Sequence, residues 1–193
     1  PSMIFWGPPG VGKTTLANII AQTQQRPFFS LSAINSGVKE IREVLDQAGK
    51  GGLFQKSAIL FIDEIHRFSK SQQDSLLGAV EKGVVTLIGA TTENPSFEVN
   101  GALLSRSQVY TLNALSKDEL NKLLADVIVR DEILRAKNIQ LEETQSLLKY
   151  SGGDARRLLN VLELVVESIP DSPCVVKNES VEKVIQTNAA RYD

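Results

Sequence analysis

The sequence contains few of the residues that mark secreted or metal-binding proteins. Among its 193 residues it has one cysteine, Cys174, and one histidine, His66. One thiol cannot form an internal disulfide, and no cluster of cysteines and histidines has metal-ligand spacing, so a reducing cytoplasm is the expected compartment. We expect Cys174 to be a structural thiol. His66 has no partner set for metal binding or nucleophilic catalysis, and we expect it to be a surface or helix-start residue.

Long apolar runs are also missing. No segment approaches the roughly 18 to 20 apolar residues of a membrane helix, and the N-terminus has no basic region followed by a long apolar stretch. The formal net charge is −2, with 21 basic and 23 acidic residues well mixed, which argues against a wholly basic protein that coats nucleic acid. We expect a soluble protein with no membrane partner, whose DNA contacts are local, transient or made by other parts.

The first 113 residues alternate between apolar runs and helical patterns. Such alternation predicts an α/β fold with a doubly wound, parallel, five-stranded sheet. The expected strands are Met3–Trp6, Phe28–Leu31, Ser57–Ile62, Val84–Ala90 and Val109–Leu112.

After Asn113 long helical patterns replace the strand-like runs. Residues 116–119 have the Ser-x-x-Glu form of a capping box, with an amphipathic stripe behind them. Further helices are expected over Glu142–Tyr150, over Ala155–Ser168 and from Ser180 onward, with a loop over residues 170–173. We therefore predict a second, all-helical domain over residues 114–193.

Residues 7–14 match the phosphate-binding pattern G-x-x-x-x-G-K-[ST] at every fixed position, between a predicted strand and a predicted helix. The glycines would let backbone N–H groups approach phosphate oxygens at a positive helix end. Lys13 would pair with the β and γ phosphates of ATP, and the Thr14 hydroxyl would ligate Mg²⁺. The alternative is a chance glycine turn. The predicted nucleotide-binding residues of this P-loop are Gly7, Pro8, Pro9, Gly10, Val11, Gly12, Lys13, Thr14 and Thr15.

Four apolar strand residues, Ile59–Ile62, lead directly into two carboxylates, Asp63 and Glu64. Ligands bind at the carboxyl ends of strands in such folds. We predict that Asp63 binds the nucleotide through Mg²⁺ and that Glu64 polarises the water that attacks the γ phosphate. An acidic pair that merely caps a helix is the alternative.

Three stretches of the sequence are distinctive: DEIHRFSKSQQD at residues 63–74, IGATTENPSF at 88–97 and GDARRLLN at 153–160. They resemble the RarA/MgsA family of AAA+ ATPases, the replication-associated recombination proteins. This family is related to the Werner-helicase-interacting ATPase and, more distantly, to clamp-loader subunits and the RuvB branch-migration motor. The resemblance covers nearly the whole chain and implies a P-loop AAA+ domain over residues 1–113, followed by a helical lid over 114–193.

The resemblance also implies roles for single residues. Thr92 matches sensor 1, which contacts the γ phosphate or the attacking water, and Arg106 matches the arginine finger, which reaches the γ phosphate of a neighbouring subunit. Arg156 matches sensor 2, which reports nucleotide state to the lid, whereas Arg157 is expected to face solvent or to pack. Ser32 corresponds to a polar switch residue of related ATPases, although a helix-capping serine is the preferred interpretation. From the residues alone, Thr92 would be a turn residue and Arg106 a surface arginine.

The activity that the resemblance implies is Mg²⁺-dependent, DNA-stimulated ATP hydrolysis at stalled or gapped replication forks, catalysed by Lys13, Glu64 and Thr92 together with Arg106 from a neighbour. The implied partners are forked, gapped or single-stranded DNA ends, single-strand-binding protein and further copies of the chain, in the nucleoid of a bacterial cytoplasm. Pro1 stands only a few residues before the P-loop and no initiator methionine precedes it, so we expect an excised fragment. The family's adenine-holding N-terminal segment and its oligomerising C-terminal domain are expected outside residues 1–193.

Three other functions fit parts of the sequence. A clamp-loader or RuvB-type subunit is disfavoured by the stretch TTENPSF at residues 91–97. A non-hydrolysing AAA+ scaffold would have no physical need for all four of Lys13, Asp63, Glu64 and Arg106. A P-loop nucleotide kinase would explain neither the acidic pair nor the helical half.

Overall fold

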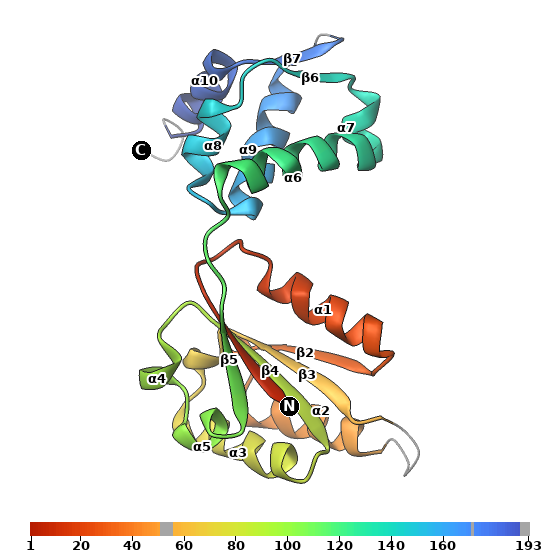
Figure 1. Ribbon diagram of the computed structural model, residues 1–193, viewed down its shortest axis with the longest axis vertical. Helices are drawn as coiled ribbons and strands as arrows, with labels where there is room; N and C mark the ends of the chain where they lie inside the picture. Colours follow the sequence, from red (N-terminus) through yellow and green to blue (C-terminus); the bar gives the residue numbers. More distant parts are fainter. Residues whose placement is uncertain (51–55, 171, 190–193) are drawn as a thin grey trace. The chain divides into compact units, whose positions relative to one another are not determined.

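The computed structural model describes residues 1–50, 56–170 and 172–189. The chain separates into two compact units, Pro1–Asn113 and Ala114–Asp193, and Figure 1 shows the sheet of the first and the helices of the second. Within the described residues, no helix is long and apolar enough to span a membrane.

The first unit contains a parallel sheet with the strand order β2-β3-β4-β1-β5. Its strands are β1 (Ser2–Trp6), β2 (Phe28–Ser32), β3 (Ala58–Asp63), β4 (Val85–Thr91) and β5 (Ser107–Thr111). Its helices are α1 (Lys13–Gln24), α2 (Val38–Gly49), α3 (Lys70–Glu81), α4 (Pro95–Glu98) and α5 (Gly101–Leu104), with a short 3₁₀ helix, η1, over Ile65–Arg67. The predicted parallel five-stranded α/β sheet is confirmed.

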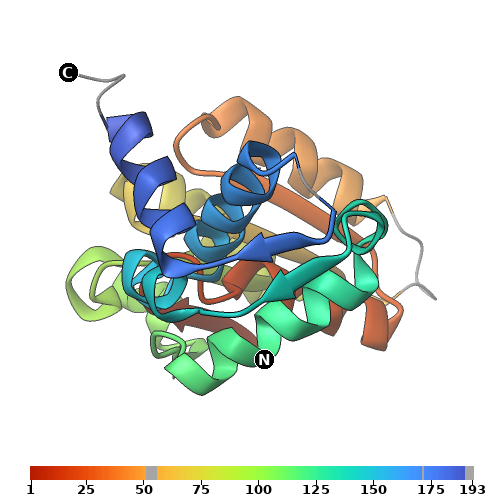
Figure 2. The same cartoon turned by 90° about the horizontal axis from the view of Figure 1, so that it is seen from above.

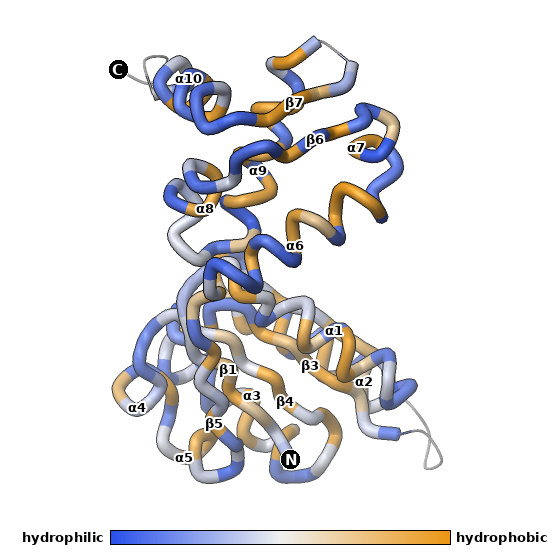
Figure 3. The backbone as a smooth tube through the Cα atoms, turned by 45° about the horizontal axis from the view of Figure 1, so that its top comes forward, coloured by the Kyte–Doolittle hydropathy of each residue, from blue (hydrophilic) through white to orange (hydrophobic). Residues whose placement is uncertain are grey.

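Helices cover both faces of this sheet, so its central strands are apolar at consecutive positions. On one face Leu60 and Ile62 pack in a cluster with residues of α2, α3 and α5. On the other face Ile59 and Phe61 pack with Ala17 and other residues of α1. Figure 3 shows the resulting apolar colouring along β1, β3 and β4.

The register places the carboxyl ends of four strands along one edge of the sheet. Trp6 at the end of β1 pairs with Thr91 at the end of β4. Ser32 at the end of β2 pairs with Asp63 at the end of β3. The segments that follow β1, β3 and β4 therefore begin side by side, which is where open α/β sheets bind ligands.

The second unit is built mainly from helices around an apolar core. Leu124, Leu147, Leu158 and Leu162 are fully buried in that core. The helices are α6 (Lys117–Arg130), α7 (Glu132–Ala136), α8 (Gln145–Ser151), α9 (Ala155–Ser168) and α10 (Asn178–Ala189). α6 begins with the predicted capping box, in which the Ser116 hydroxyl accepts from the N–H of Glu119 at 3.3 Å.

The prediction that this unit is all-helical is wrong in one respect. β6 (Ile139–Leu141) and β7 (Cys174–Val176) form a two-stranded parallel sheet, visible as two neighbouring arrows in Figure 2. Three-residue runs are too short for hydrophobic periodicity to reveal. Of the expected loop over residues 170–173, position 171 lies outside the described residues. Cys174 is buried in this sheet, and burial raises the pKa of its thiol, as expected of a structural cysteine.

Candidate nucleotide-binding site

The P-loop follows β1 and is shaped by its glycines. The N–H of Gly7 donates to the carbonyl of Thr91 at 3.1 Å, and a Cβ at position 7 would lie 2.2 Å from the carbonyl oxygen of Leu112. Gly10 and Gly12 have φ angles of 69° and 91°, in the left-handed region that favours glycine. The loop therefore passes between β4 and the end of β5 with no room for a side chain at its first residue.

The P-loop leads into the N-terminus of α1. Gly12 is the N-cap residue, and in this described segment no side chain caps the helix and no acidic residue stands in its first turn. Thr14 and Thr15 in that turn are exposed. An uncompensated positive helix end with accessible N–H and hydroxyl groups is the arrangement that binds phosphate.

Lys13 points back into the loop. Its side chain is buried, and its Nζ donates to the carbonyl oxygens of Gly7 and Pro8, each at 2.8 Å. The ammonium group thus stands among the P-loop backbone atoms, where it can neutralise a bound phosphate.

β3 delivers the two carboxylates to the same edge of the sheet. Its residues from Ala58 to Ile62 are buried, and Asp63 and Glu64 are half-buried. Glu64 has a φ of 54°, a conformation that costs a residue with a side chain roughly 1 to 3 kcal/mol and that is concentrated at functional sites. This left-handed residue ends β3 and opens η1.

The predicted sensor, Thr92, lies beside the predicted catalytic acid. Its Oγ1 is 3.4 Å from Oε2 of Glu64. The structure thus brings together Thr92 and Glu64, which are 28 positions apart in the sequence, through the pairing of β3 with β4.

Two further residues of this site were missed by the sequence analysis. His66 Nδ1 lies 3.3 Å from Oε2 of Glu64 and 2.9 Å from Oγ1 of Thr91. The side chain of His66 is only 10% exposed, so the expectation of a surface residue is wrong, although it does stand in the short helix η1. Thr91 is fully buried. No sequence signal predicts a contact between positions 25 apart, since it depends on the pairing of β3 with β4.

Arg106 lies at the opposite edge of the sheet from the P-loop of its own chain. It precedes β5, whose first residue pairs with Ser2 at the start of β1. Its Nη2 contacts Oε1 of Glu81 at 2.6 Å, and its Nη1 donates to the carbonyl of Ala102 at 2.9 Å. One strand length, about 15 Å, therefore separates Arg106 from the P-loop of its own chain.

The remaining predicted positions have less defined surroundings. Arg156 and Arg157 are both exposed near the start of α9 in the second unit, so the distinction between them rests on the family pattern alone. Ser32 ends β2, where its carbonyl accepts from the N–H groups of Asn35 and Ser36.

The P-loop edge fits ATP with Mg²⁺ in its donor chemistry. It offers a lysine, the N–H groups of a helix end, a threonine hydroxyl and an aspartate, and Mg²⁺ usually takes only one or two protein carboxylates besides phosphate and water. Among the described residues no group of three or more His, Cys, Asp and Glu could hold a metal by itself.

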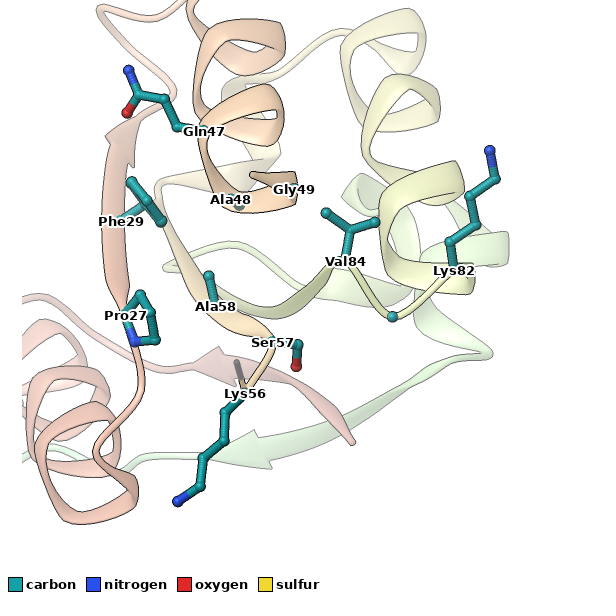
Figure 4. Close-up of a pocket in the computed structure, with 11 residues that line it drawn as sticks. Pro27, Phe29, Gln47, Ala48, Gly49, Lys56, Ser57, Ala58, Lys82 and Val84 are labelled. Atoms are coloured by element: carbon teal, nitrogen blue, oxygen red, sulfur yellow. The ribbon is translucent and has the colours of Figure 1, made fainter. Parts of the chain in front are cut away.

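A pocket of about 400 Å³ lies at the other edge of the sheet, near the starts of β3 and β4 (Figure 4). Its lining includes Phe29, Lys56, Lys82 and Val84. It contains none of the P-loop or acidic residues, so we do not assign it to the nucleotide.

Each of the two units matches a protein-family model. Residues 3–115 match the model described as "ATPase family associated with various cellular activities (AAA)", and residues 135–193 match the model "AAA C-terminal domain".

Individual relatives give the same picture. Replication-associated recombination protein A of Haemophilus influenzae is 47% identical over 100% of this chain and 44% of its own length, and that of Escherichia coli K12 is 43% identical over the same shares. ATPase WRNIP1 of Dictyostelium discoideum is 48% identical over 87% of this chain and 19% of its own. The resemblance to the RarA/MgsA family is thus confirmed, and the chain spans less than half the length of these relatives.

A solved structure shares the fold. The Thermotoga maritima RuvB Holliday junction branch migration motor is 25% identical and superposes with a TM-score of 0.78 over 96% of this chain and 61% of its own.

Proposed function

The chain belongs to the ATPase family associated with various cellular activities, and we propose that it is the ATP-binding and ATP-hydrolysing core of a DNA-dependent ATPase of replication-associated recombination and repair. One observation carries the catalytic part of this proposal. The P-loop, the Asp63–Glu64 pair and Thr92 follow three adjacent strands at one edge of the sheet.

In the proposed reaction the P-loop N–H groups and Lys13 bind the β and γ phosphates. Thr14 and Asp63 would hold Mg²⁺, which neutralises charge that develops on these phosphates. Glu64 accepts a hydrogen bond from a water molecule and takes its proton as the water oxygen bonds to the γ phosphorus. The bond from that phosphorus to the β–γ bridging oxygen breaks, and ADP and phosphate leave. Thr92 helps to orient Glu64 and the water.

Arg106 would act on the γ phosphate of a neighbouring copy. Its place at the far edge of its own sheet supports action between subunits. An arginine finger is worth roughly 10³ to 10⁵ in rate in the systems where it has been measured. Arg156 would link the nucleotide state to the second unit, which we propose to be the lid, so that loss of the γ phosphate changes the lid and the subunit contacts.

The DNA part of the proposal rests on the relatives. Two of them are named replication-associated recombination protein A, and the structural relative is named a Holliday junction branch migration motor. We propose forked or gapped DNA, single-strand-binding protein and further copies of the chain as partners in a bacterial cytoplasm. A clamp-loader or RuvB-type motor remains the alternative within the enzymes, and a non-hydrolysing scaffold the alternative outside them.

Steady-state ATPase activity of the complete protein that contains this chain tests the proposal, with and without gapped or forked DNA. DNA should raise the rate, and Glu64→Gln and Arg106→Ala should each abolish it. An ATPase rate that does not change when DNA is added would contradict the proposed role in recombination. ATP binding without turnover would favour the non-hydrolysing scaffold.

A further inference from the structure

His66 connects the proposed catalytic carboxylate to the buried end of β4. One ring nitrogen, Nδ1, lies 3.3 Å from Oε2 of Glu64 and 2.9 Å from Oγ1 of Thr91. The side chains of His66 and Glu64 are 10% and 25% exposed, and Thr91 is fully buried. Thr91 also pairs with the last residue of β1, directly before the P-loop. The histidine is thus in contact with the buried strand β4, which adjoins the phosphate-binding loop.

The partners of Nδ1 favour one histidine tautomer. Its hydroxyl donates to the carbonyl of Glu93 at 3.2 Å and accepts from the N–H of the same residue at 3.0 Å. With its hydrogen on that carbonyl, the hydroxyl accepts from His66. An ionised carboxylate of Glu64 can only accept. The tautomer with the hydrogen on Nδ1 therefore satisfies both contacts together.

We propose that His66 is a positioning residue that fixes the carboxylate of Glu64 for the attacking water, an inference that rests on the proposed hydrolysis. Among the described residues, the side-chain contacts of Glu64 all involve Oε2, from His66 and Thr92. Oε1 is left to accept the hydrogen bond of the water. Anchoring one oxygen through Nδ1 to a buried strand gives the other a fixed direction.

Two amide substitutions separate this role from a merely structural one. The side-chain nitrogen of asparagine occupies the place of Nδ1, whereas that of glutamine reaches the place of Nε2. His66→Asn keeps a donor toward Glu64, and His66→Gln removes it while it keeps a polar side chain of similar size.

The measurement is kcat of the complete protein, with ATP affinity and thermal midpoint as controls. His66→Gln should lower kcat roughly ten- to a hundredfold, the effect of one lost hydrogen bond to a charged group, while His66→Asn stays within about threefold of wild type by the same scale. ATP affinity should be unchanged in both. Equal kcat values in the two variants, or losses that follow only the thermal midpoint, would overturn the proposal.

Thr91 supplies a second kinetic test. Thr91→Val should lower kcat in the wild type but not further in the His66→Gln variant, because both changes break one chain of contacts. Independent, additive losses of kcat would contradict a connected series of contacts from Thr91 through His66 to Glu64. Absence of hydrolysis by the wild type would instead overturn the proposed function and this inference together, whereas active but indistinguishable variants overturn this inference alone.

A readout without turnover uses the fact that the chain contains one histidine. In a ¹⁵N-labelled sample of the 193-residue chain, the two ring nitrogens can be observed without assignment. With the ring neutral, Nδ1 should be the protonated nitrogen, and its resonance should move in the Glu64→Gln variant. The opposite tautomer, or an Nδ1 resonance that is the same in Glu64→Gln as in the wild type, would refute the contact between His66 and Glu64.

Discussion

Single atoms decide how the P-loop can be built. At Gly7 an added Cβ would stand 2.2 Å from a carbonyl oxygen, so the requirement for glycine is steric. At Gly12 an added Cβ would meet nothing within 4 Å, but the φ of 91° disfavours other residues. The two glycines of the motif are thus needed for different reasons, and only the second follows from the backbone conformation.

Replacing Gly7 with alanine should displace the P-loop from Leu112. Overpacking of this kind costs roughly 1 to 3 kcal/mol, and ATP affinity should fall because the N–H groups move. Gly78→Ala is the matched control, since its Cβ meets nothing within 4 Å and it lies inside α3, where alanine is favoured by roughly 0.5 to 1 kcal/mol. Urea denaturation and nucleotide titration measure both variants, and equal behaviour would refute the steric argument.

Glu81 holds the proposed arginine finger within its own chain. The pair is more than 40% exposed on each side, and such a pair contributes at most about 1 kcal/mol to folding. Glu81→Gln should therefore leave the thermal midpoint nearly unchanged and leave turnover of the assembled protein equal to or above wild type, whereas Arg106→Ala abolishes it. If Glu81→Gln lowered turnover as Arg106→Ala does, the finger would need Glu81 in the active state.

At the level of elements, the sequence predicted the sheet well and the contacts between its strands poorly. β3 was expected over Ser57–Ile62, because consecutive apolar residues indicate a strand that is covered on both faces. The observed strand runs over Ala58–Asp63. The strand order is set by packing between distant segments. The contact between His66 and Thr91 depends on this order, and no pattern in the neighbouring sequence predicts it. On α1 the size of an apolar side chain does not indicate its burial: Leu16 and Ile19 are exposed, whereas the smaller Ala17 is buried against the sheet.

Helix α9 should be the main support of the second unit. Leu162 is fully buried and Leu164, two positions on, is 41% exposed. Leu162→Ala should destabilise this unit by about 2 to 5 kcal/mol, and Leu164→Ala by less than about 1 kcal/mol.

Two spectroscopic signals can locate the effect. Trp6, the one tryptophan of the chain, lies in β1, so its fluorescence reports on the first unit, while circular dichroism reports on both. In Leu162→Ala the part of the dichroism change that comes from the second unit should occur at a lower temperature. The fluorescence transition of the first unit should stay where it is in the wild type. A parallel shift of both signals would mean that the units unfold as one.

The start of α6 carries a pH-dependent cap. The N–H and the hydroxyl of Ser116 hydrogen-bond to the carboxylate of Glu119 and lower its pKa below the ordinary value of 4.5. A lowered pKa means that the ionised form stabilises the fold, so the contribution is present above pH 4.5 and is lost as the pH falls through the lower folded value. Ser116→Ala keeps the backbone N–H and removes the hydroxyl, so it should raise the pKa of Glu119 part of the way toward 4.5. Carboxyl carbon NMR measures this pKa, and an unchanged titration would contradict the hydroxyl contact.

At the level of the whole molecule, the proposed hydrolysis combines residues at the carboxyl ends of the strands with an arginine from a neighbouring copy. The P-loop and Glu64 stand at the carboxyl ends of the strands, and Arg106 stands at the amino ends. Copies that meet with unlike edges would complete each site from two chains, as in heterologous contacts between subunits.

The central claim is that this edge cleaves ATP through Glu64, and a single-turnover experiment tests it most directly. Radiolabelled ATP with Mg²⁺ is mixed with an excess of the complete protein, and the release of γ phosphate is compared between wild type and Glu64→Gln. We predict that both bind ATP and that only the wild type releases phosphate. Release at the wild-type rate by Glu64→Gln, or bound ATP that the wild type leaves intact, would contradict the account.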